Sequence, residues 1–118
     1  MPRISDDDLK ALRAKHSRGL VVLNVLNEDG ESVHDFVFKK IDRGAYAQYR
    51  AANKHAMASG GGSGEEEQQL ARQLLVWPDD NKAAFDELRE SAPAVATNFG
   101  GELLVDASAG FSVDRDPR

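Results

Sequence analysis

The chain has 118 residues, of which 41% are hydrophobic and 30% charged, a balance that fits one globular domain with a modest core. It contains no cysteine, which excludes disulfides, thiolate nucleophiles and cysteine-ligated zinc. Residues 1–58 carry eight acids and ten bases, whereas residues 59–118 carry twelve acids and five bases, for a net charge of -5. This acidic C-terminal half repels phosphate backbones, so nucleic acid is not an expected partner.

The sequence indicates a cytoplasmic protein. No apolar run is long enough to span a bilayer, and the N-terminal MPRISDDDLK has three acids where a signal peptide needs its apolar segment. We therefore expect no membrane association.

A short helix is predicted near the N-terminus. The hydroxyl of Ser5 can cap it, and the acids at 6–8 complement the positive end of its dipole. Leu9 and Leu12 give one turn of apolar spacing, and Gly19 is expected to stop the helix.

A β-hairpin follows this helix. The stretch LVVLNVL (20–26) is rich in β-branched residues, and the turn cluster NEDG (27–30) separates it from a second strand at 31–40. Phe36 and Phe38 lie on one side of that strand. His34 shares their parity and is expected at the margin of the same face, as a structural residue.

A helix opened by Asp42 and a Gly/Ser connector are predicted next. Apolar residues recur at spacings of three and four in this helix: Ala45, Tyr46, Tyr49, Ala52 and Ala56. Both tyrosines are expected in the core with solvated hydroxyls. SGGGSG (59–64) is expected to be a flexible connector. It is not a phosphate loop, because three glutamates follow it instead of Gly-Lys-Ser/Thr.

Three further helices are predicted in the C-terminal half. The first runs from Glu65 to about Trp77, where Pro78 ends it. The second is capped by Asp79 or Asp80 and buries Ala84, Phe85 and Leu88, and the third is capped by Ser91. In the third helix Val95, Phe99 and Leu103 are spaced by four, and Gly100-Gly101 is expected to weaken or bend it.

These elements predict the α+β class, with a short β-hairpin packed against a bundle of four to five short helices. One domain is expected at 1–106, with the connector 59–64 inside it and a flexible C-terminal tail at 107–118.

The sequence offers no catalytic constellation, so an enzyme is not expected. His16, His34 and His55 are predicted on three separate elements and without metal-type spacing. The acid clusters occupy predicted helix N-termini, where capping explains them, and no serine lies in a Gly-x-Ser-x-Gly elbow. No cofactor and no metal are expected.

The order of the short motifs carries more information than any one of them. These are the helix end at Lys15-His16, DFVFKK (35–40), DRGAY (42–46), LVWPD (75–79), Phe85 with Leu88, and Ala92-Pro93. In this order they resemble a group of small bacteriophage tail assembly chaperones. The resemblance spans about residues 5 to 105. The chain departs from the family pattern in the SGGGSG insertion, in Ala94, in Gly100-Gly101 and in the tail.

The resemblance implies a protein that binds the long helical tape measure protein and keeps it soluble while tail tube subunits polymerise around it. It implies a place in the cytoplasm of the bacterial host cell, or association with the virion. The residues predicted to bind the partner are Trp77, Phe85, Leu88, Phe99 and Leu103. The alternative is that these are core residues, as a small domain requires of most large apolar side chains.

Two other functions stay open at this stage. One is a structural subunit or adaptor retained in a phage or phage-like particle. The other is a small cytosolic enzyme or ligand-binding module, in which His34 or His55 would meet a carboxylate in a concave pocket. The sequence also leaves open a homo-oligomer, because the apolar stripes of short helices can pack within one chain or between chains.

Overall fold

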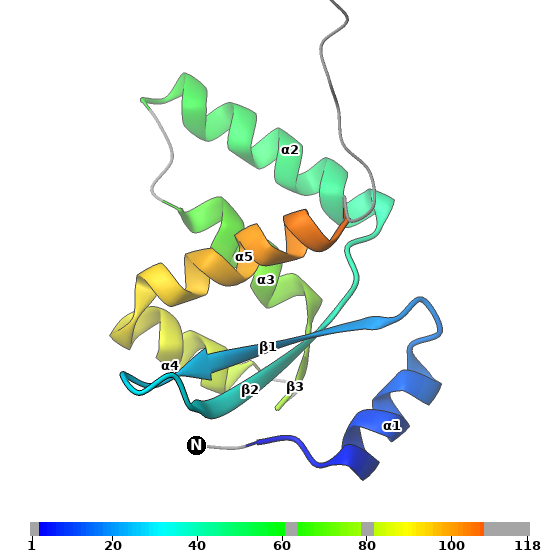
Figure 1. The fold of residues 1–118 in the computed structure, drawn as a ribbon. Coiled ribbons are helices and arrows are strands. Elements are labelled where there is room, and N and C mark those ends of the chain that lie inside the picture. Colours follow the sequence, from blue (N-terminus) through cyan, green and yellow to red (C-terminus); the bar gives the residue numbers. More distant parts are fainter. Residues whose placement is uncertain (1–2, 61–63, 79–81, 108–118) are drawn as a thin grey trace, which may run out of the picture.

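Figure 1 shows the fold in a computed structural model that describes residues 3–60, 64–78 and 82–107. The described residues form five helices and one three-stranded antiparallel sheet, which confirms the predicted α+β class. The elements are, in chain order, α1 (Asp6–Lys15), β1 (Leu20–Leu26), β2 (Ser32–Lys39), α2 (Arg43–Ala58), α3 (Glu65–Leu74), β3 (Leu75–Trp77), α4 (Ala83–Ser91) and α5 (Pro93–Ala107). Residues 61–63 of the predicted connector and 108–118 of the predicted tail lie outside the described residues.

The hairpin forms where the sequence predicts it. β1 and β2 pair in antiparallel register, with Leu23 opposite Phe36 and Val25 opposite His34. Phe36 and Phe38 point into the core and are almost fully buried. His34 is buried as well, with 6% of its surface exposed, so it lies deeper than the predicted margin of that face.

The sheet has a third strand that the sequence did not predict. The helix expected to reach Trp77 ends at Leu74, and the next three residues turn into an extended strand. Here Leu75 pairs with Phe38 and Trp77 pairs with Val37 on the free edge of β2. Pairing with a distant strand satisfies backbone groups that a helix end would leave open, so tertiary structure overrides the local helical spacing. The Trp77–Pro78 peptide bond is cis.

Both predicted N-terminal caps of the first two helices are confirmed. The Ser5 hydroxyl accepts a hydrogen bond from the Asp8 N–H at 3.1 Å, and the Asp42 carboxylate accepts one from the Ala45 N–H at 2.7 Å. The burial predicted for Tyr46 is wrong, because 43% of its surface is exposed. Of the sixteen described residues of α2, Ala45 alone is buried.

The helix starts in the C-terminal half differ from the prediction. The proposed caps Asp79 and Asp80 lie outside the described residues, and α4 begins after Lys82, which adopts a left-handed conformation at φ 65°. The prediction that Ser91 caps the last helix is wrong. Ser91 is the last residue of α4, and its hydroxyl donates back to the Glu87 carbonyl, as serine does at helix ends.

The last helix is not broken by its glycine pair. α5 runs without interruption through Gly100 and Gly101 to Ala107. Gly100 is buried at the crossing of α5 over α3, where a Cβ atom would come within 2.3 Å of the Glu67 carbonyl oxygen. The glycine therefore lets two helix backbones approach each other, and packing outweighs its poor helix propensity.

The core lies between the sheet and the layer of α3, α4 and α5. The rings of Phe36, Phe38, Phe85 and Phe99 meet there, with centroids 5.3 to 6.5 Å apart. In Figure 1, α2 lies on the far side of α3 and α5 from the sheet, and α1 lies at the opposite side of the molecule. None of the described helices has the length and apolar character needed to cross a membrane.

Candidate partner-binding site

Three of the five residues predicted to bind a partner lie in the core. Phe85, Phe99 and Leu103 are 0%, 5% and 1% exposed. These three are therefore core residues, as the alternative prediction stated, and their side chains fill the space between the sheet and the helices. Trp77 on β3 and Leu88 on α4 are partly exposed.

Leu88 lines an open apolar groove between α4 and the hairpin. We call it the Leu88 groove, and its walls are Val25, His34, Phe36, Ala84, Glu87, Leu88 and Ser91. Its volume is about 320 Å³, near the lower end for sites that hold a small ligand. The residues come from two strands and one helix, so the sequence could not bring them together from local spacing. Trp77, Phe85, Phe99 and Leu103 do not line this groove.

His34 forms part of the groove wall. Its ring stacks on Phe36 with centroids 4.2 Å apart and planes 2° apart, as residues two apart on one strand face allow. Burial lowers the pKa of His34, while the neighbouring charge of Asp35 opposes that shift. The lowered pKa favours the neutral form of the ring.

Asp35 lies on the other face of β2 and fastens the N-terminal segment to the sheet. Its carboxylate accepts hydrogen bonds from Arg3 Nε at 2.9 Å, from the Ile4 N–H at 2.9 Å and from Asn24 Nδ2 at 2.6 Å. Burial by itself would raise the pKa of Asp35, but these three donors outweigh burial and lower it. The sequence did not identify this residue, because an acid that alternates with buried residues along a strand is expected to face solvent.

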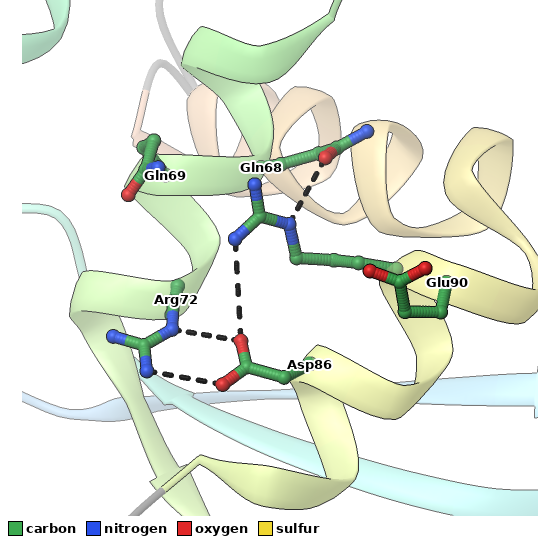
Figure 2. Close-up of a pocket in the computed structure, with 6 residues that line it drawn as sticks. Gln68, Gln69, Arg72, Asp86 and Glu90 are labelled. Atoms are coloured by element: carbon green, nitrogen blue, oxygen red, sulfur yellow. Dashed lines mark hydrogen bonds and ion pairs between the residues drawn. The ribbon is translucent and has the colours of Figure 1, made fainter.

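A second, polar pocket lies between α3 and α4 (Figure 2). It is open to solvent, has a volume of about 540 Å³ and is lined by Gln68, Gln69, Arg72, Asp86, Arg89 and Glu90. Arg72 and Asp86 point toward each other across it and form two hydrogen bonds, at 2.8 and 3.1 Å. The hydrogen bond from Arg72 is the main reason that the pKa of Asp86 is lowered. Two arginines and two acids line the pocket, so their charges balance, and the Arg72–Asp86 pair connects α3 to α4.

Gln68 joins three helices at the inner end of this polar pocket. It is 7% exposed, accepts a hydrogen bond from Arg89 Nε at 3.1 Å, and donates to Thr97 Oγ1 at 3.0 Å and to the Pro93 carbonyl at 3.3 Å. A buried side chain with satisfied donors and acceptors is a structural connection. We therefore assign the polar pocket to the stability of the helix layer.

α2 presents a further exposed surface. Tyr49 attaches the helix to α3 by donating a hydrogen bond to Glu67 Oε1 at 3.0 Å, and burial together with this bond raises the pKa of Tyr49 to about 12. On the flank of the helix next to that contact are four exposed residues, which we call the basic face of α2: Tyr46, Arg50, Lys54 and Met57. The Arg50 guanidinium lies 6.0 Å from the centre of the Tyr46 ring, within cation–π range.

The three histidines remain on separate elements. His16 follows α1, His34 lies on β2 and His55 lies on α2. Within residues 3–60, 64–78 and 82–107, no three potential metal-ligating side chains gather closely enough to hold a metal ion. His34 and Glu87 do line the same groove, which is the feature that a ligand-binding module requires.

Comparisons with protein-family models, with curated proteins and with solved structures gave no match for this chain.

Proposed function

We propose that this chain is a phage tail assembly chaperone or adaptor, which binds a helical tape measure protein and keeps it soluble during tail tube assembly. The order of its motifs, from DFVFKK to LVWPD and the Phe85–Leu88 helix, supports the proposal. The structural observation that carries it is the Leu88 groove, an open apolar groove on a domain of this size.

The groove suits one projecting apolar side chain of an amphipathic helix. Val25, Phe36 and Leu88 supply the apolar walls. Glu87 is exposed at the groove and provides a polar rim beside it. An amphipathic helix places apolar anchors at spacings of three and four, and a groove that covers such an anchor prevents the helix from aggregating.

Co-expression with the tape measure protein encoded in the same phage or prophage genome tests this function. We expect the chain to raise the soluble fraction of that protein several-fold, and Leu88→Ala to abolish the gain because it removes an apolar wall of the groove. Leu104→Ala is the matched control, because Leu104 is also partly buried against the core but does not line the groove. A tape measure protein that stays insoluble with the wild-type chain would refute the proposal.

The position of His34 favours a second candidate, a small ligand-binding module. Its ligand would have an apolar body and a hydrogen-bonding group that meets His34 or Glu87. In a thermal-shift screen of small metabolites, a ligand at a hundred times its Kd should stabilise the wild type by about 2.7 kcal/mol. His34→Gln should lose this shift, and His55→Ala, altered on the distant α2, should keep it. A screen in which no metabolite shifts the wild type would remove this candidate.

A further inference from the structure

We propose that the basic face of α2 is a docking surface for an acidic amphipathic helix of a protein partner. The inference rests on the proposed function in one respect, since it takes the partner to be helical. It adds a second surface, remote from the Leu88 groove, and the charge of the segment that binds there.

The first observation is the weak attachment of α2. One of its sixteen described residues is buried, and the helix packs against α3 through the side that carries Ala45 and Tyr49. In Figure 1 it lies in the outermost layer, beyond α3 and α5. A helix of this length therefore leaves most of its circumference open.

The second observation is the kind of side chain on the open side. Tyr46, Arg50, Lys54 and Met57 follow one another at spacings of four, four and three, so they lie along one helix face. Tyr46 is 43% exposed and Met57 is 63% exposed, and they are two of the four large apolar side chains exposed in the described part of the chain. Tyrosine, methionine and arginine are the residue types enriched at protein interfaces.

Charge identifies the occupant. α2 contains Arg43, Arg50, Lys54 and His55 but no acid, in a chain whose net charge is -5. A partner segment that covers Tyr46 and Met57 would therefore meet positive charge beside them, and acids flanking an apolar strip complement it. Tyr46 and Met57 are eleven residues apart, which is about 16 Å along the helix axis. The occupant is thus a helix of at least three turns.

Two other occupants fit less well. A second copy packed through α2 about a twofold axis would set the basic residues of one helix against those of the other, which is unfavourable. Nucleic acid would meet the exposed cations Arg43, Arg50 and Lys54, but the net charge of the chain is -5, which repels a phosphate backbone.

Fluorescence anisotropy with two labelled helical peptides tests the inference. Each peptide is about 20 residues long, with leucines at helical spacing and either glutamates or lysines on the flanks. We expect the full chain to bind the glutamate peptide, with affinity that falls as salt rises, and to bind the lysine peptide at least tenfold more weakly. Tyr46→Ala and Met57→Ala should each weaken binding about tenfold. Leu26→Ala, another exposed apolar site that lies on β1, should leave binding unchanged.

Several outcomes would overturn the inference. These are no binding of the glutamate peptide, equal binding of both peptides, or equal losses in Leu26→Ala and Met57→Ala. If the chain bound an oligonucleotide, and Met57→Ala and Arg50→Ala each abolished that binding, the basic face of α2 would be a nucleic-acid-binding surface instead. If analytical ultracentrifugation showed self-association that Met57→Ala abolished, the basic face of α2 would be an interface between two copies of the chain. The peptide assay contains no tape measure protein. A negative result in it would therefore refute the docking surface on α2 without refuting the proposed chaperone function, which the co-expression assay tests.

Discussion

Gly100→Ala should lower the free energy of unfolding by about 2 kcal/mol or more. In an open helix the same change stabilises by up to about 1 kcal/mol, because alanine has the higher helix propensity. At Gly100 the added Cβ would lie 2.3 Å from the Glu67 carbonyl oxygen and 2.7 Å from its carbonyl carbon. These are backbone atoms, so α3 and α5 must move apart, and overpacking of this kind costs about 1–3 kcal/mol and sometimes more. The steric term therefore exceeds the gain in propensity, and urea unfolding would measure the balance.

The neighbouring glycine provides the control. Among the described residues, a Cβ at Gly101 meets no atom within 4 Å beyond its chain neighbours and the backbone of its own helix, although it lies next to Gly100 in α5. We expect Gly101→Ala to raise the free energy of unfolding by about 0.5–1 kcal/mol. If the two variants shifted stability in the same direction and by similar amounts, the close crossing of α3 and α5 would not exist in solution.

The contrast between these glycines shows which parts of the fold could be predicted from the sequence. The Ser5 and Asp42 caps and the hairpin at 20–40 depend on residues within a few positions of one another, and the structure confirms them. Gly100 and Gly101 look the same in a sequence, because their difference lies in Glu67, which is 33 positions away. The strand Leu75–Trp77 was missed for the same reason, since its partner is β2.

The candidate site was less predictable than the fold. Spacing alone marks an apolar stripe but does not say which side of it meets solvent, so Phe85 and Leu88 received the same assignment although one is buried and the other lines a groove. Tyr46 was predicted in the core but is exposed, because the predicted apolar stripe of α2 was wider than the side of the helix that contacts α3. Side chains that act through distant partners, such as Gln68 and Asp35, leave no local pattern.

Asp35→Asn should destabilise the chain by about 2 kcal/mol at pH 7. Asp35 is 2% exposed, and its carboxylate accepts hydrogen bonds from Arg3, from the Ile4 N–H and from Asn24. Hydrogen bonds to a charged group contribute a net stability of about 1.5–3 kcal/mol each, and an amide can accept some of them but not all. The Arg3 side chain is 54% exposed, so its guanidinium can be solvated by water when the carboxylate is lost. The loss of stability is therefore smaller than for breaking a fully buried ion pair.

The pH dependence distinguishes loss of the charge from loss of packing. The pKa of Asp35 in the fold lies below its ordinary value of 3.8. The charged form therefore contributes its full stability above about pH 4, and the contribution is lost as the pH falls through the lowered pKa of the folded state. The gap between wild type and Asp35→Asn should narrow as urea unfolding is repeated from pH 7 toward pH 2.5. Glu102→Gln, an equal change of charge at an exposed position of α5, should stay within about 0.5 kcal/mol of wild type at pH 7. A gap for Asp35→Asn that stayed constant down to pH 2.5 would mean that shape, and not the negative charge, holds the N-terminal segment on the sheet.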